Sequence, residues 1–211
     1  MRARAAVLYV HGLWMRGAEA LLLGRRLSRQ RGYRLQVFHY GSVHEPLETV
    51  LARLSDTIAR LEASEVHLIG HSLGGAVILH CLARHRMSQA GRVVFIGAPV
   101  LGSRSAQTLA RWPLGTRLLG QGAAQLMLGG GQRRWAQSRE LGVIAGTAPI
   151  GFGQLLLRFN EPSDGTVAVS ETQLPGAKAC LSVPVTHMGL VFSARVAQEV
   201  GSFLQYGSFG Q

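Results

Sequence analysis

The chain has 211 residues, a length that fits one domain whose core needs neither disulfides nor a structural metal. It carries 22 basic residues against 11 acidic ones, a net charge of +11, and Lys178 is the one lysine among them. The arginines are scattered and accompany no nucleic-acid-binding motif, so we expect no nucleic-acid partner. The charge does fit weak association with an anionic membrane surface.

The cysteines and the apolar runs bear on the compartment. Cys81 and Cys180 do not form a disulfide framework in a chain of this length, and we expect both to be small buried hydrophobic residues. No apolar run reaches the roughly 18 residues of a transmembrane helix, and the short one after the basic start does not fit a cleaved signal peptide. We therefore expect a cytoplasmic protein, peripheral to a membrane at most; the oligomeric state is not predicted.

Strand-like and helix-like patterns alternate along the chain, without an internal repeat or a linker. The clearest helix, 47–61, carries apolar residues at helical spacing after Pro46. Alternation of this kind predicts one α/β domain over 1–211, with a mainly parallel twisted sheet of about six strands, helices on both faces and active loops at the carboxyl ends of the strands. We expect strands at 5–10, 33–40, 66–69, 92–96, 141–145 and 179–185, and helices at 18–30, 47–61, 76–86 and about 190–205.

The segment 103–140 interrupts this rhythm with nearly forty residues of weak periodicity, rich in leucine, glycine and arginine. Loops of that length are usually functional or have structure of their own. We expect one or two short helices that form a small cap or lid, or else helices that simply pack on the core. In a cap, an acyl pocket could be lined by Leu118, Leu119, Leu126, Met127 and Leu128.

A Gly-His-Ser-Leu-Gly sequence occupies residues 70–74, between a predicted buried strand and a predicted helix. A serine at the tip of such a turn has a strained backbone, and Gly70 and Gly74 let strand and helix approach closely. The helix N-terminus favours negative charge that develops beside the serine. We interpret Ser72 as a catalytic nucleophile.

A serine nucleophile needs a base, and His187 follows the last predicted strand. The side chain of His71 should point away from the Ser72 oxygen. Five further histidines lie on or beside predicted helices and strands, and we interpret them as core or surface residues: His39, His44, His67, His80 and His85.

A carboxylate must orient that base, and the chain has two aspartates. Asp56 lies on an amphipathic helix and is expected to be a solvated surface charge. Asp164 precedes Gly165 in a turn that can hold a carboxylate, although the turn lies well beyond the preceding strand. We choose Asp164 as the acid, with Glu161 as the alternative.

The order Ser72, Asp164, His187 is that of α/β-hydrolases. The chain resembles a small bacterial α/β-hydrolase of the lipase and esterase kind, similar to the lid-poor lipases and the GPI-inositol-deacylase-like group. The matching segments are 7–12, 70–75, 97–99, 164–167 and His187. The resemblance implies the α/β-hydrolase fold with a small cap segment.

The same resemblance assigns an oxyanion hole and an activity. After the His11-Gly12 pair, Leu13 would donate one backbone N–H and Leu73 the second. The resemblance implies a serine esterase or lipase acting on small-molecule or lipid esters, with the tendency of the lipase subgroup to favour medium or longer acyl chains. An acyltransferase or thioesterase would use the same residues, and a non-catalytic arginine-rich binding protein is the remaining alternative. No cofactor or metal signature is present in the sequence.

Overall fold

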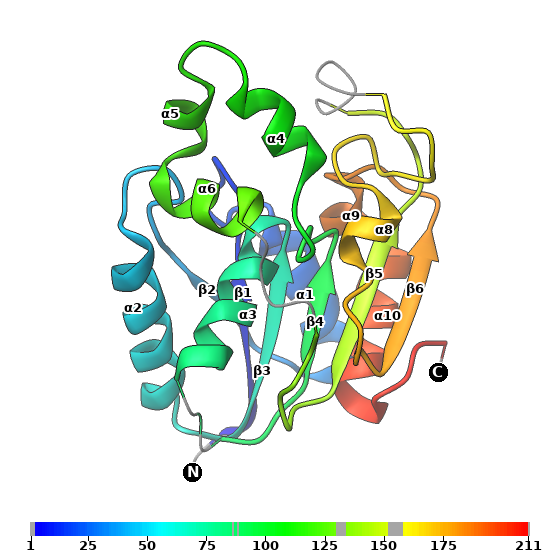
Figure 1. Ribbon diagram of the computed structural model, residues 1–211. Helices are drawn as coiled ribbons and strands as arrows, with labels where there is room; N and C mark the ends of the chain where they lie inside the picture. Colours follow the sequence, from blue (N-terminus) through cyan, green and yellow to red (C-terminus); the bar gives the residue numbers. More distant parts are fainter. Residues whose placement is uncertain (1–2, 86, 88, 130–133, 152–157, 211) are drawn as a thin grey trace.

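Six parallel strands form one sheet at the centre of the computed structural model, which describes residues 3–85, 87, 89–129, 134–151 and 158–210 (Figure 1). Their order across the sheet is β2-β1-β3-β4-β5-β6, and every neighbouring pair is parallel. The strands are β1 (Ala3–Val10), β2 (Leu35–Phe38), β3 (Ala63–His71), β4 (Val93–Ile96), β5 (Leu141–Gly146) and β6 (Ala179–Val183). The predicted parallel sheet is confirmed.

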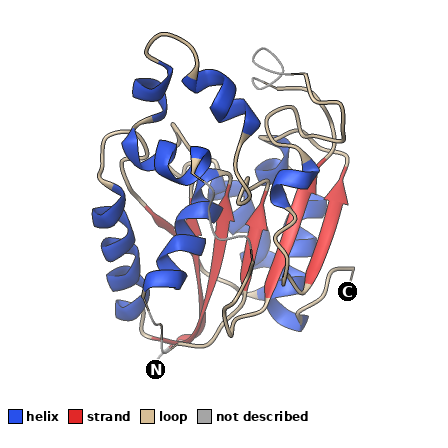
Figure 2. Ribbon diagram, viewed as in Figure 1, coloured by secondary structure: helices blue, strands red, loops and turns tan. Residues whose placement is uncertain are grey.

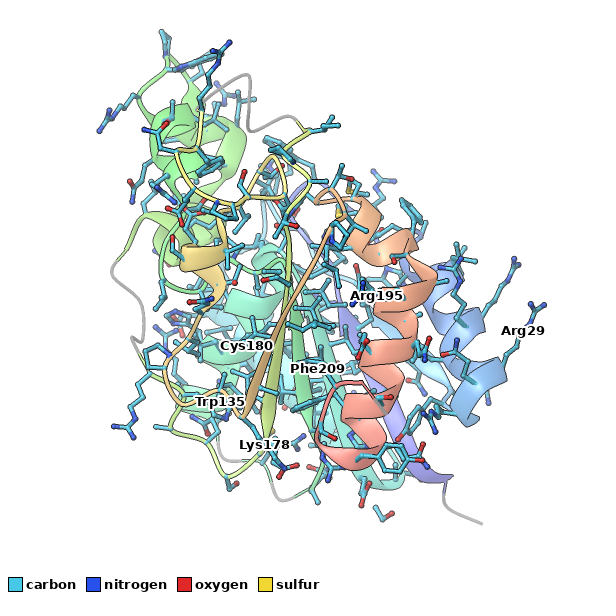
Figure 3. The ribbon with its side chains drawn as sticks, turned by 90° about the vertical axis from the view of Figure 1, so that its right-hand side faces the viewer. Arg29, Trp135, Lys178, Cys180, Arg195 and Phe209 are labelled. Carbon is cyan, nitrogen blue, oxygen red and sulfur yellow. The ribbon has the colours of Figure 1, made fainter. Side chains whose placement is uncertain are left out.

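The inner strands are buried on both faces, which explains their continuous apolar sequences. Every residue of β4 and β5 is buried, and Val7 of β1 pairs with His67 of β3. The edge strands β2 and β6 alternate instead between partly buried and exposed positions, and each has one buried residue, at its end. Cys180 lies on the outer strand β6 and is exposed (Figure 3), so the prediction that it is buried was wrong; Cys81 is buried as expected.

Helices cover both faces of the sheet (Figures 1 and 3). One face packs against α1, α9 and α10 through side chains such as Leu23, Val191 and Phe203. The other face packs against α2, α3 and α6 through Leu54, Ile78 and other apolar residues. These helices are α1 (Ala20–Arg31), α2 (Leu47–Arg60), α3 (Leu73–Arg84), α6 (Gln121–Leu128), α9 (Gly189–Phe192) and α10 (Ala194–Tyr206).

The predicted final helix is two helices, α9 and α10, separated at Ser193. The Ser193 backbone is extended, with φ −71° and ψ 131°, and the Ser193 hydroxyl accepts a hydrogen bond from the Val196 N–H at 3.3 Å. Serine is a strong N-cap residue because its side chain replaces a missing backbone acceptor. The apolar periodicity continues across the break, which is why the pattern predicted a single helix.

The segment 103–140 contains three helices among its described residues, where one or two were expected: α4 (Arg104–Ala110), α5 (Gly115–Leu119) and α6. Figure 2 shows them beyond the edge of the sheet toward which the strand arrows point. Leu119, Leu126 and Met127 are buried in the hydrophobic core, whereas Leu118 is exposed. Leu119, at the end of α5, and Leu126 and Met127 of α6 therefore pack on the core, and an acyl pocket lined by this segment stays a prediction.

The described residues include one further short helix, α8 (Val169–Thr172), between β5 and β6. No helix in the described part of the chain is both long and apolar enough to cross a membrane.

Candidate active site

Ser72 occupies a single-residue turn between β3, which ends at His71, and α3, which begins at Leu73. Its backbone has φ 53° and ψ −125°, a conformation that residues with a side chain rarely adopt. The Ser72 N–H donates to the Ile96 carbonyl at 3.0 Å, and the Ser72 carbonyl accepts from the Gly75 N–H at 3.0 Å. These bonds hold the strained residue, with 8% of its surface exposed, at the carboxyl edge of the sheet.

Close packing fixes the glycines on either side of Ser72. A Cβ on Gly70 would lie 2.5 Å from the Gly75 Cα, and one on Gly74 would lie 2.1 Å from the Val10 carbonyl oxygen. Both distances are below any contact that real side chains make. The sequence therefore needs glycine here to bring β1, β3 and α3 together, which is the reason that the motif predicted.

Asp164 and His187 form a buried pair beside this turn. Asp164 Oδ2 lies 2.7 Å from His187 Nδ1, and the His187 N–H donates to the Asp164 carbonyl at 2.9 Å. Asp164 Oδ1 accepts the N–H groups of Thr166 and Val167 at 2.9 and 2.7 Å. Gly165 has φ 86°, which allows this tight turn. The carboxylate is thereby fixed at both oxygens, with one of them aimed at the imidazole.

A glycine outside the nucleophile motif makes room for this pair. Gly97 has φ 56°, and a Cβ there would lie 3.2 Å from both Asp164 Oδ2 and His187 Nδ1. The residue follows β4, so the strand next to β3 also contributes to the site. Sequence reasoning matched Gly97 to a family segment but assigned it no role, because the residues that it contacts are distant in sequence.

His71 is fully buried against the ring of His187, with ring centroids 4.9 Å apart. Its Nε2 lies 3.3 Å from the His187 carbonyl oxygen, which can only accept, so His71 donates this bond. Burial, together with the neighbouring His187, lowers the pKa of His71 to about 3. The ring is therefore neutral and supports the backbone of His187.

His11 and Gly12 follow β1, and Leu13 comes next. His11 Nδ1 lies 2.9 Å from the Gly12 carbonyl, and the His11 ring stacks on Tyr40 at 4.3 Å. The Tyr40 hydroxyl donates to the His11 carbonyl at 2.8 Å, while burial lowers the pKa of His11 and raises that of Tyr40. Sequence reasoning missed Tyr40, which lies 29 residues from the turn that it supports.

The turn that carries Leu13 lies next to the candidate nucleophile. A Cβ on Gly12 would lie 3.1 Å from the Ser72 Cβ. Leu73 is the first residue of α3, where a backbone N–H has no acceptor within the helix. In the described residues, the Ser72 hydroxyl makes no hydrogen bond. A cavity between Leu73 and α6 has a volume of only about 10 Å³.

The alternative acid, Glu161, faces a different partner. Its carboxylate lies 2.6 Å from Nη2 of Arg104, at the start of α4. Arg104 also contacts Glu171, a buried carboxylate that accepts the Ala168 N–H at 2.9 Å. This ion-pair cluster ties α4 to the chain that follows Asp164; no periodic pattern in the sequence pointed to Glu171. Asp56 is exposed on α2, as expected.

The remaining histidines lie elsewhere. His67 is buried within β3, where burial and two nearby arginines lower its pKa to about 4. His39 and His44 are exposed. His80 and His85, at α3, are partly exposed. Among the described residues, no group of three or more histidine, cysteine, aspartate or glutamate side chains could hold a metal ion.

Comparison with known proteins supplies a family. A model described as the alpha/beta hydrolase family matches residues 7–192. No protein of curated function matches the chain. The fold is similar to that of a lipase-esterase related protein from Clostridium acetobutylicum (TM-score 0.66, 14% identity, 95% of each chain covered). It is also similar to an esterase from Exiguobacterium antarcticum (TM-score 0.65, 17% identity, 97% of this chain and 93% of that one).

A metagenomic carboxyl esterase is a further structural neighbour, with a TM-score of 0.63 and 20% identity over 89% of this chain. The chain spans 65% of that protein's length. Identities this low show the fold alone, whereas the family model matches most of the sequence. The chain belongs to the alpha/beta hydrolase family.

Proposed function

We propose that this protein is a serine carboxylester hydrolase with Ser72 as nucleophile, His187 as base and Asp164 as the acid that orients it. The observation that carries the proposal is the 2.7 Å contact between His187 Nδ1 and Asp164 Oδ2, beside a serine with positive φ. A carboxylate at Nδ1 leaves Nε2 of the neutral ring available to accept a proton. Family membership and the esterases with a similar fold support the same chemistry.

The first half-reaction forms an acyl-enzyme. Ser72 Oγ attacks the ester carbonyl carbon while His187 Nε2 takes the hydroxyl proton, and Asp164 stabilises the resulting imidazolium. Collapse of the tetrahedral intermediate breaks the bond to the leaving oxygen, which receives the proton from His187. Water then attacks the acyl carbon with His187 again as base, and release of the carboxylic acid restores Ser72.

The backbone N–H groups of Leu13 and Leu73 would hold the oxyanion of both intermediates. Leu73 opens α3, whose N-terminus favours negative charge, and Gly12 brings the Leu13 turn next to Ser72. Loss of one such donor typically lowers the rate by about 10²–10³-fold. His11 acts differently: its ring is engaged with the Gly12 carbonyl and Tyr40, so it positions the turn without touching substrate.

A chain-length series of p-nitrophenyl esters, from acetate to palmitate, tests the proposal together with a fluorophosphonate probe. We expect turnover and labelling at Ser72, and a loss of turnover of at least about 10⁴-fold in Ser72→Ala. Ser28→Ala, the same substitution at an exposed serine on α1, should behave as wild type. Turnover that survives in Ser72→Ala would refute the assignment, and added alcohol or thioester substrates would detect acyl transfer or thioesterase activity.

A further inference from the structure

Three described residues other than glycine have positive φ: Trp14 at 59°, Ser72 at 53° and Leu114 at 66°. Ser72 is the proposed nucleophile, and strain there serves its reaction. Trp14 and Leu114 are large, apolar and exposed, at 52% and 68% of their surface. A left-handed backbone costs a leucine roughly 1–2 kcal/mol, and exposure removes most of the packing that could offset it. Neither residue is what stability alone would select.

Backbone and side-chain bonds bring these two residues together with Trp112 and Leu118. The Trp14 indole N–H donates to the Leu118 carbonyl at 3.0 Å, and the Leu118 N–H donates to the Leu114 carbonyl at 3.0 Å. The Trp112 carbonyl accepts from the Gly115 N–H at 2.9 Å. Trp112 and Leu118 are themselves 53% and 52% exposed. We call these four residues the cap platform.

The cap platform lies on the side of the molecule toward which the strands point. Helices α4 and α5 form the end of the molecule at the top of Figure 1. Trp14 directly follows Leu13, the proposed oxyanion donor. Trp14 therefore links the platform to the turn that lies next to Ser72.

The charge around the cap platform is mainly positive. Arg111 and Arg117 are exposed next to Trp112 and Leu118 in the sequence, and exposed Arg16 follows Trp14 by two residues. Glu45, an acidic residue that lines hollows with Arg16 and Arg117, is paired with Arg53. Indole and leucine side chains surrounded by arginines match a bilayer surface, where indole sits at headgroup level and arginine pairs with anionic lipid.

We propose that the cap platform docks the protein on the surface of an anionic phospholipid bilayer. Leu114, Trp112, Trp14 and Leu118 enter the interface, and Arg111 and Arg117 contact the headgroups. The apolar side chains of the platform favour a lipid surface over a merely charged partner. A surface that recognised charge alone would gain nothing from a strained, exposed leucine. Docking does not depend on ester hydrolysis, so it stands or fails separately from the proposed function.

Vesicle binding tests the proposal. We expect the protein to sediment with phosphatidylglycerol vesicles and to bind phosphatidylcholine vesicles more weakly at the same salt concentration. Tryptophan emission should shift to shorter wavelength on binding, since Trp14 and Trp112 are exposed, whereas Trp135 is buried and does not contribute to the shift. Ser72→Ala should bind as wild type does.

Matched variants separate the cap platform from the overall positive charge. Leu114→Asn introduces a residue that tolerates positive φ and should weaken binding about tenfold or more, because the leucine side chain no longer enters the bilayer. Leu21→Ala, at an exposed leucine on α1, should leave vesicle binding unchanged. Arg111→Gln and Arg117→Gln should each lower the affinity for phosphatidylglycerol vesicles about fivefold. Arg29→Gln and Arg195→Gln, on the opposite side of the molecule (Figure 3), should lose clearly less.

Two results would overturn the proposal. The first is an absence of binding to phosphatidylglycerol vesicles. The second is binding that Leu114→Asn leaves unchanged while all four arginine variants weaken it equally, which would mean adsorption through the net charge of +11.

Discussion

The nucleophile turn and the cap platform both contain residues with positive φ, but different forces hold them there. At Ser72, packing dictates the conformation, because Gly70 and Gly74 have backbone atoms within 2.5 Å of where a Cβ would lie. At Leu114 the side chain is 68% exposed, so its packing does little to hold the backbone at positive φ. Strain in the first region is part of the buried architecture. In the second, the backbone is close-packed at Gly115, where a Cβ would lie 1.8 Å from the Leu109 carbonyl oxygen, but the side chain of Leu114 itself gains little packing, which points to a role at the surface.

The largest expected effect lies in the buried region. Asp164→Asn should lower kcat for a p-nitrophenyl ester by about 10⁴-fold, because the amide favours the wrong tautomer of His187. Asn can still accept from the Thr166 and Val167 N–H groups, so thermal unfolding should show a folded protein.

Glu161→Gln is the matched control for this change. Glu161 contacts Arg104 rather than His187, so kcat should stay within a few-fold of wild type. If Glu161→Gln lost activity while Asp164→Asn kept it, the acid would have been assigned to the wrong carboxylate.

Overpacking the nucleophile turn should have the next largest effect. Gly74→Ala places a methyl group 2.1 Å from the Val10 carbonyl oxygen, and we expect about 3 kcal/mol of destabilisation or more in urea unfolding. Gly122→Ala on α6 is the control, because its Cβ would meet neighbours at 3.5 and 3.6 Å, an ordinary contact. That change should stabilise by about 0.5 kcal/mol. Equal changes in the free energy of unfolding for Gly74→Ala and Gly122→Ala would mean that close backbone packing at Gly74 does not hold the nucleophile turn.

Acid should loosen the sheet and the nucleophile turn while leaving the charge of the cap unchanged. The folded-state pKa values of His71 and His67, about 3 and about 4, lie below the ordinary 6.5, so the unfolded chain binds more protons in between. Their contribution to stability is complete above pH 6.5 and is lost as the pH falls toward those values. With two protons the slope approaches about 2.7 kcal/mol per pH unit.

Urea unfolding measured between about pH 7 and pH 5 checks this slope. Glutamine at position 67 keeps an acceptor for the Arg92 N–H and does not titrate. His67→Gln should therefore lower the slope by the share of one proton, about 1.4 kcal/mol per pH unit. His44→Gln, at an exposed histidine, should not change it. In 101–139 the only strongly basic or acidic side chains are arginines, so the charge of the cap stays fixed throughout this range. A slope that His67→Gln leaves intact would contradict the assignment.

Sequence reasoning reached the features that depend on local pattern. Buried strands are continuous apolar runs, and Ser72, Asp164 and His187 follow β3, β5 and β6 in a known order. It did not reach features set by contacts between distant segments, such as the Tyr40 hydroxyl on the His11 carbonyl or the space that Gly97 leaves for the Asp164–His187 pair. The exposure of Cys180 was missed because an edge strand looks like an inner one in a short apolar run.

The smallest predicted effect is the most direct test of the comparison. Leu114→Gly should stabilise the protein by about 0.5–1 kcal/mol, raising Tm by about 2 °C, because relief of the positive φ exceeds the entropy that glycine adds to the unfolded chain. Leu118→Gly, within α5 and similarly exposed, should instead destabilise by about 1 kcal/mol. Opposite signs at two neighbouring leucines, measured by thermal unfolding, would show that the backbone at 114 is held against its own preference. Destabilisation by both would mean that Leu114 contributes packing that its exposure conceals, and the strain on the cap platform would then have the same origin as the strain at Ser72.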